Sequence, residues 1–163
     1  MATQSPAEAF QPSGPKLEVR MQNGGKFVIT TDKAGSPKTV EHIVGLVKRG
    51  FYNRQRVHRV EPWVTQWGAP QSKTKNIDTD EVRGGGSGKD IEFEASKWDY
   101  HRGVVGIAST GLQVGGDSQI FILKKDTFRL YRSYAVLGKV TSGMDVVDMI
   151  KKGDRMISIR VIR

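Results

Sequence analysis

The chain has 163 residues, a formal net charge of +9 and no cysteine. At this length one domain can bury a full hydrophobic core, so the fold needs no covalent or metal cross-links. The absence of cysteine excludes disulfides, thiol catalysis and cysteine-based zinc sites. No apolar run approaches the ~20 residues that a membrane span requires, so we expect no membrane partner.

Basic residues concentrate towards the C-terminus, where residues 101–163 contain 11 Lys and Arg against 5 Asp and Glu. Such an excess could support weak, salt-sensitive contacts with nucleic acid. The basic positions alternate with apolar strand positions instead of forming a block, which is typical of a solvated surface. We expect no nucleic-acid partner, and we expect a monomer.

The first fifteen residues are rich in Ala, Ser, Pro and Gln and contain little that could pack, which predicts a disordered leader over 1–15. The folded domain is then expected to span 16–163. The leader lacks a basic stretch followed by an apolar one, so no secretory signal is visible and we expect a cytoplasmic protein. Export is the alternative, because removal of a signal would leave the same sequence.

The first predicted element is a β-hairpin. Two alternating runs, 16–22 and 26–31, are separated by Asn23-Gly24-Gly25. This turn sequence allows positive backbone angles at no steric cost, so the two runs are expected to pair as antiparallel strands.

Two helices are predicted. The first begins with Ser36 as N-cap and Pro37 at the first helical position, and Gly50 ends it. The second spans about 143–152. Their apolar faces are expected to be formed by Val40, Ile43, Val44 and Val47 in the first helix and by Val146, Val147 and Ile150 in the second.

Between the helices the sequence predicts strands at 56–61 and 63–67, joined at Pro62, which lacks a backbone donor and suits a corner. A long irregular region follows at 69–102. It contains the glycine-rich segment 84–89, which lacks the spacing of a phosphate-binding loop and is therefore expected to be a flexible surface loop.

Four further strands are expected at 103–109, 119–123, 135–141 and 157–162. Many short strands with only two helices, and no regular alternation of the two, favour a largely antiparallel sheet closed into a barrel. The two helices would cap the open ends of that barrel.

Side chains suited to an uncharged peptide occur on the predicted strands. Arg59 and Gln66 flank the proline corner, and Gln119 and Phe121 share one face of a strand because side chains alternate with period two. Together they supply one fixed cation, two amides and an aromatic floor. The three histidines have no second ligand at a supporting interval, so we expect no metal and no cofactor.

The order and spacing of these motifs resemble the cyclophilin-type peptidyl-prolyl cis-trans isomerases over residues 16–163. The resemblance implies a mainly β fold, an eight-stranded antiparallel closed barrel capped by two α-helices. It implies that the activity is rotation of X-Pro bonds in unfolded or flexible polypeptides. The motifs that carry it are Pro37-Lys38-Thr39-Val40-Glu41, Gly50-Phe51-Tyr52, His58-Arg59-Val60 with Pro62 and Gln66, Arg102-Gly103, Ile107-Ala108, Ser118-Gln119-Ile120-Phe121-Ile122, Val136-Leu137-Gly138-Lys139-Val140 and Gly143-Met144-Asp145-Val146-Val147.

By this resemblance Arg59 and Gln66 are the expected catalytic residues, with the permanent charge of Arg59 stabilising a twisted amide. The expected partners are proline-containing segments of client proteins. The residues expected to bind them are Trp63, Val64, Ala108, Ser109, Gln119, Phe121, Leu130 and Tyr134.

The chain departs from the family pattern between Pro62 and Gln66, where it is one residue short. Either Trp63 or Val64 could take the place of the phenylalanine that is usual there. Arg129 lies where some members carry a tryptophan that contacts cyclosporin, so we expect weak cyclosporin binding. The irregular stretch leaves a second interpretation open, namely a proline-peptide binding module or chaperone with weak or no turnover.

Overall fold

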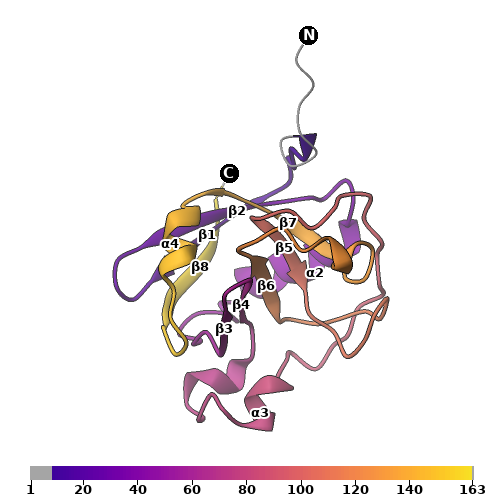
Figure 1. Cartoon of the computed structure of the whole chain (residues 1–163). Helices are drawn as coiled ribbons and strands as arrows, with labels where there is room; N and C mark the ends of the chain where they lie inside the picture. Colours follow the sequence, from indigo (N-terminus) through magenta and orange to yellow (C-terminus); the bar gives the residue numbers. More distant parts are fainter. Residues whose placement is uncertain (1–8, 163) are drawn as a thin grey trace.

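The computed structural model describes residues 9–162, and its main feature is one strongly curled antiparallel sheet of eight strands (Figure 1). The spatial order is β3-β4-β6-β5-β7-β2-β1-β8. The strands are β1 (Lys16–Met21), β2 (Lys26–Thr31), β3 (Arg59–Glu61), β4 (Val64–Trp67), β5 (Val104–Ile107), β6 (Ile120–Leu123), β7 (Val136–Ser142) and β8 (Met156–Ile162). All eight predicted strands are therefore present, and the β1–β2 hairpin turns at Gly24 with a positive φ of 97°.

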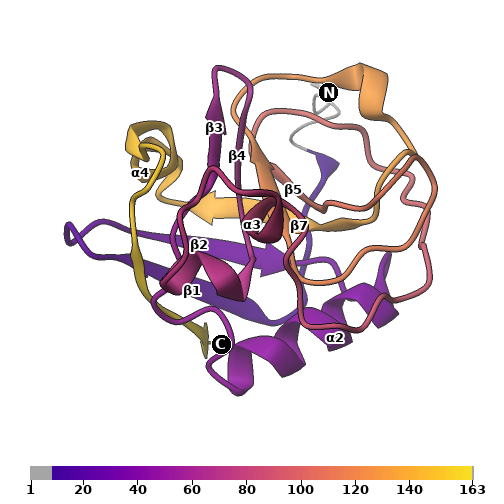
Figure 2. The same ribbon diagram turned by 90° about the horizontal axis from the view of Figure 1, so that it is seen from below.

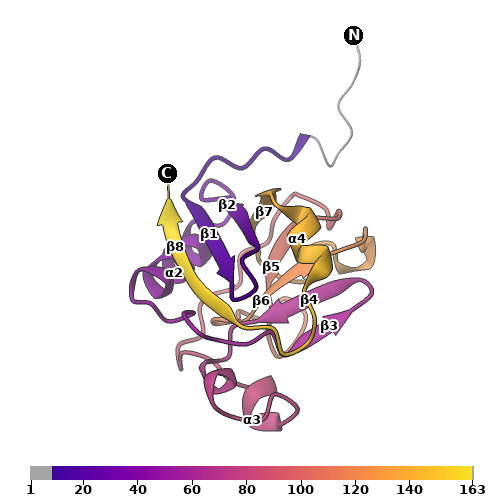
Figure 3. The ribbon, with the colours of Figure 1, turned by 90° about the vertical axis from the view of Figure 1, so that its left-hand side faces the viewer.

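The prediction that the barrel is closed is wrong. The two end strands, β3 and β8, each have one neighbour within residues 9–162. Between the two ends the described residues form one isolated bridge, from Arg56 to Arg155, and a few backbone hydrogen bonds that join residues 54–57 to 153–156, but no continuous ladder. Residue 56 was expected to belong to the strand that becomes β3, but its backbone leaves the ladder there, so the curled sheet stays open along this line. Figure 3 shows β8 as a long curved strand that follows β1.

Both predicted helices are present, α2 (Pro37–Lys48) and α4 (Met144–Met149), and they pack on the same main core from different ends of the curled sheet (Figure 2). Val40, Ile43 and Val47 of α2 are buried in the main core. Gly50 follows the helix with a φ of 72°. This left-handed conformation, usually adopted by glycine, is common just after the end of a helix.

Ser36 is the N-cap residue of α2 and Pro37 its first helical residue, as predicted. The Ser36 side chain makes no capping hydrogen bond. The carboxylate of Glu94 accepts the free N–H groups of Lys38 at 3.1 Å and of Thr39 at 2.7 Å. A residue 55 positions away therefore supplies the cap, which satisfies orphan donors of the first turn.

The long region after β4 contains secondary structure that the sequence analysis did not predict. A 3₁₀ turn, η1 (Pro70–Lys73), is followed by the single-turn helix α3 (Asp80–Arg83). Thr79 caps α3 by accepting the N–H of Val82 at 3.4 Å. A second 3₁₀ turn, η2 (Phe128–Leu130), follows β6.

None of the helices within residues 9–162 has the length and apolar character needed to cross a lipid bilayer.

A second apolar cluster lies on the other face of β4 and β6. Ile120 and Ile122 belong to the main core, whereas Phe121 belongs to this second cluster, which confirms the predicted separation of the two faces. The members of the cluster are Phe10, Val64, Tyr100, Val104, Phe121, Leu123 and Val136.

The predicted leader is only partly described, since residues 1–8 lie outside the described part of the chain. The rest packs on the domain. Phe10 is 2% exposed and stacks on Trp98, with ring centroids 4.9 Å apart. Lys139 donates to the carbonyl of Phe10, and Thr31 donates through its N–H to the carbonyl of Pro15. This segment is thus part of the second apolar cluster.

We predict that Phe10→Ala lowers the free energy of unfolding by about 2–3 kcal/mol, the scale of a fully buried phenylalanine. Urea unfolding of the two proteins measures the change. Phe128→Ala is the matched control, because Phe128 is 50% exposed and its loss is expected to cost much less. An equal, small effect of both substitutions would contradict the role assigned to Phe10.

Candidate active site

The β3–β4 hairpin brings Arg59 and Gln66 together. In its antiparallel register Arg59 lies directly opposite Gln66 and Glu61 opposite Val64, so the connection is the two-residue turn Pro62-Trp63. The Nη1 of Arg59 donates to Oε1 of Gln66 at 3.1 Å. The shortened sequence between Pro62 and Gln66 therefore makes a tight hairpin that still pairs the two predicted catalytic residues.

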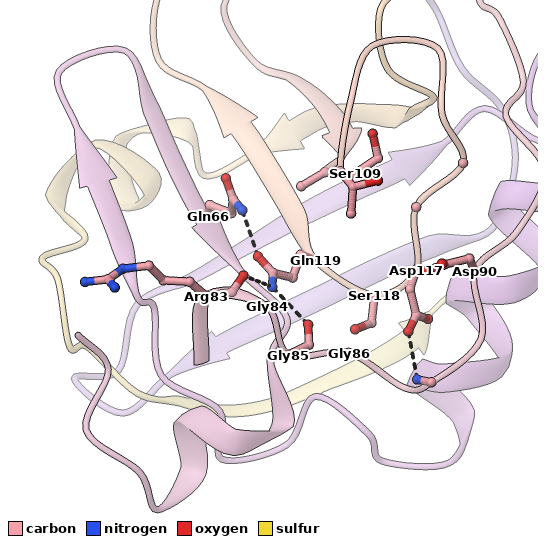
Figure 4. A pocket seen from close by; sticks show the side chains of 15 residues that line it. Gln66, Arg83, Gly84, Gly85, Gly86, Asp90, Ser109, Asp117, Ser118 and Gln119 are labelled. Atoms are coloured by element: carbon pink, nitrogen blue, oxygen red, sulfur yellow. Dashed lines mark hydrogen bonds between the residues drawn. The ribbon is translucent and has the colours of Figure 1, made fainter. Parts of the chain in front are cut away.

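A line of hydrogen bonds continues from Gln66 into the neighbouring strand. The Nε2 of Gln66 donates to Oε1 of Gln119 at 2.8 Å. The Nε2 of Gln119 donates in turn to the carbonyls of Arg83 at 2.8 Å and Gly85 at 2.9 Å (Figure 4). Both glutamine side chains are buried, so this chain of bonds fixes which way each amide points.

Beside Arg59 lies a cavity of about 300 Å³, at the lower end of the range for ligand sites, which we call the slot. Nine of the ten predicted site residues line it, and Gln119 stands outside it as the hydrogen-bond partner of Gln66. Arg129 also lines the slot. The lining residues are Arg59, Trp63, Val64, Gln66, Ala108, Ser109, Phe121, Arg129, Leu130 and Tyr134.

Aromatic packing fixes the floor of the slot. The Phe121 ring stacks on Tyr100 at 6.3 Å and meets the edge of Tyr134 at 5.7 Å between centroids. Burial raises the pKa of Tyr100, so its hydroxyl stays protonated and donates to the backbone carbonyl of Tyr134. A Cβ at Gly106 would lie 2.3 Å from the Phe121 ring, so only glycine fits there without moving the floor.

Both candidates for the usual phenylalanine position line the slot. Val64 is 1% exposed and belongs to the apolar cluster with Phe121. Trp63 is partly exposed, and two guanidinium groups lie near its ring, with the Cζ of Arg59 at 5.3 Å and that of Arg129 at 4.7 Å from the centroid. Val64 therefore contributes to the buried wall and Trp63 to the outer, cation-binding wall.

Arg59 is also held by a carboxylate. Its Nε donates to Oε2 of Glu61 at 2.7 Å, and its Nη2 lies 2.6 Å from the same oxygen. Together with the bond from Nη1 to Gln66 this positions the guanidinium from two sides. Each terminal nitrogen carries two N–H groups, so donors remain for a bound peptide.

A second cavity of about 410 Å³ adjoins the slot, and we call it the adjoining cavity (Figure 4). Gln66, Ala108 and Ser109 line both. The rest of its wall is formed by the glycine-rich segment with its flanking residues and by the loop that precedes β6: Arg83, Gly84, Gly85, Gly86, Gly88, Asp90, Thr110, Gly115, Gly116, Asp117, Ser118 and Gln119.

The glycine-rich segment 84–89 is an irregular surface loop, as predicted, and hydrogen bonds tie it to Asp117. Asp117 accepts hydrogen bonds from the Ser87 hydroxyl and from the N–H groups of Gly88 at 2.9 Å and Lys89 at 3.3 Å. A Cβ at Gly86 would lie 2.6 Å from the Asp117 carboxylate. The glycines therefore allow the backbone to approach this carboxylate closely.

Asp117 also accepts from Nε2 of His42 at 2.8 Å, which ties the segment to α2. Burial alone would raise the pKa of Asp117, but the hydrogen bonds from Ser87, His42 and the backbone outweigh it and lower the pKa. The carboxylate is thus charged and anchors one wall of the adjoining cavity. No sequence pattern indicated this role, because the four donors lie 28 to 75 positions away from Asp117.

His58 is buried beside Arg59. Burial, together with the charge of Arg59, lowers the pKa of His58 to about 4. The imidazole is therefore neutral at physiological pH, and the fixed charge of Arg59 is not joined there by a second, titrating cation.

The sequence of this chain is similar to a known protein family and to individual proteins. Residues 16–161 match the family model for cyclophilin-type peptidyl-prolyl cis-trans isomerase/CLD. The chain belongs to this family. A probable peptidyl-prolyl cis-trans isomerase of Brucella abortus is 42% identical over 122 residues, which are 72% of this chain and 62% of that relative. This chain therefore spans less than two thirds of the length of that relative.

Two further proteins are matched over a larger share of their own length. Peptidyl-prolyl cis-trans isomerase B of Bacillus subtilis is 31% identical over 86% of this chain and 94% of its own length. The crystal structure of a Cryptosporidium parvum cyclophilin-type isomerase aligns with a TM-score of 0.76 at 19% identity, over 91% of this chain and 98% of that one. At this identity the second similarity shows the fold.

The lowered pKa of His58 predicts a specific acid sensitivity of the fold. The unfolded imidazole takes up a proton near pH 6.5 and the folded one near pH 4, so stability falls as pH falls through this window. We expect His58→Gln to remove this part of the dependence of the free energy of unfolding on pH. Urea unfolding between pH 4 and pH 7 tests it, and an unchanged slope in the variant would refute the assignment.

Proposed function

We propose that the protein accelerates cis-trans isomerisation of X-Pro peptide bonds. The observation that carries the proposal is a positioned guanidinium, that of Arg59, on the wall of a slot whose floor is the Phe121 ring. The reaction makes and breaks no covalent bond, since only the ~18–20 kcal/mol barrier of amide resonance has to be lowered. The site needs neither a nucleophile nor a metal for this.

The chemistry follows from what changes in the twisted amide. Rotation removes the double-bond sharing between carbonyl and nitrogen, so the nitrogen becomes more basic and accepts a donor that the planar amide does not. The N–H groups of Arg59 that remain free can supply this donor. Because Glu61 and Gln66 already hold the guanidinium, little reorganisation is needed when the amide twists.

The substrate class that this geometry supports is a peptide with proline in the slot. Ala108 and Ser109 line both cavities, so a peptide that passes along them would place a neighbouring residue in the adjoining cavity. One related crystal structure, 18% identical to this chain, is of a Cryptosporidium parvum isomerase in the presence of the dipeptide Ala-Pro.

Arg129 on the slot wall is consistent with weak cyclosporin binding.

A binding module with little turnover is the second candidate, and the Arg59–Glu61 contact favours it. A carboxylate 2.6 Å from the guanidinium offsets part of the charge that the twisted amide would use. NMR exchange spectroscopy on a short X-Pro peptide separates the two functions. Shifted peptide signals with an unchanged cis-trans exchange rate would favour the module.

We predict that Arg59→Ala lowers kcat/KM by about 10²–10³-fold, the usual cost of removing one preorganised electrostatic donor, and leaves the fold intact. A protease-coupled assay on an X-Pro peptide measures the rate, and circular dichroism checks the fold. Arg49→Ala, which removes an exposed arginine outside the slot, is expected to keep the parent rate. A folded Arg59→Ala variant with parent activity would overturn the proposed mechanism.

A further inference from the structure

Arg129 is a cation of the slot that the proposed chemistry does not use. It lies in η2, its side chain is exposed, and it lines the slot beside Leu130. Its guanidinium carbon lies 4.7 Å from the centre of the Trp63 ring. The indole ring attracts a cation at this distance, which holds the charge at the outer wall instead of leaving it free in solvent.

The charge of Arg129 is not balanced by the surrounding carboxylates. Within residues 9–162, Arg129 forms no ion pair. Glu61 is engaged with Arg59, and Asp126 accepts the N–H of Arg102 at 2.8 Å and faces His101 at 3.6 Å. No Asp or Glu of this part of the chain lines the slot. One fixed positive charge is therefore left over at the outer wall.

The position of this charge relative to a peptide follows from the two cavities. Gln66, Ala108 and Ser109 line both of them, whereas Trp63 and Arg129 line the slot alone. A peptide that fills the adjoining cavity on one side of its proline would leave the slot elsewhere along its wall, where Arg129 is the exposed charge that neither Glu61 nor Gln66 holds.

We propose that Arg129 is a specificity-determining residue that selects substrates with a carboxylate next to the proline, on the side away from the adjoining cavity. The inference rests on the proposed isomerase function. The guanidinium fork can receive a Glu or Asp side chain in a charge-assisted hydrogen bond, and the Trp63 ring presents that fork already oriented. A lysine at the same peptide position would be repelled.

The test uses three peptides that differ only in having Glu, Gln or Lys beside the proline, made once with this residue before the proline and once with it after. NMR exchange spectroscopy gives kcat/KM for each. We expect, at one of the two positions, a 3- to 10-fold preference for Glu over Gln, the scale of one partly exposed charged hydrogen bond, and a further loss with Lys. Added salt is expected to reduce the preference.

Three variants assign the effect to the residue. Arg129→Gln is expected to bring the Glu to Gln ratio to within about 1.5-fold, which is the scale of the weakest exposed ion pairs. Arg129→Lys keeps the charge and is expected to keep a reduced preference. Arg132→Gln, an equal change of net charge at an exposed arginine outside the slot, is expected to leave the ratio unchanged.

The outcomes separate this inference from the proposed function. Turnover of the Gln peptides reports the isomerase activity itself. If that turnover is absent, the ratio of the Glu and Gln dissociation constants from NMR titration replaces the ratio of rates. Equal ratios in the parent and in Arg129→Gln, or no preference for Glu at either position, would overturn the role of Arg129.

Discussion

The pairing of Arg59 with Gln66 across the β3–β4 hairpin is the constraint on which the site depends. A shift of β3 by one residue in this register would turn Arg59 to the opposite face of the sheet and separate it from Gln66. The two-residue turn fixes the register, and the line of hydrogen bonds through Gln119 to the carbonyls of Arg83 and Gly85 fixes the side chains. The guanidinium is therefore held by the fold itself before any peptide binds.

The floor of the slot has a different physical origin. It belongs to the second apolar cluster, which also contains Phe10 from the segment that precedes the sheet. The Tyr100 ring of the same cluster stacks on Phe121, and its hydroxyl donates to the backbone carbonyl of Tyr134. The same packing that stabilises the domain thus fixes the position of the Phe121 ring, and in the proposed function this ring is the surface that receives the proline.

The sequence predicted what depends on local periodicity. Alternation with period two separated Phe121 from its neighbours, and the proline corner located Arg59 on its strand. Contacts between distant segments were not predictable, because each depends on where the chain returns in space. Glu94 caps α2 from 55 positions away, and Asp117 draws in the glycine-rich segment. Closure of the barrel was inferred from strand number, but it depends on a pairing of end strands that an isolated bridge replaces.

The most direct test of the central claim is a crystal structure of the protein with a short peptide that contains Ala-Pro. The account predicts the proline ring in the slot against Phe121 and Leu130, with a terminal nitrogen of Arg59 within hydrogen-bond distance of the amide that precedes the ring. A peptide bound elsewhere would contradict it, as would a guanidinium that contacts Glu61 and Gln66 but no atom of the peptide.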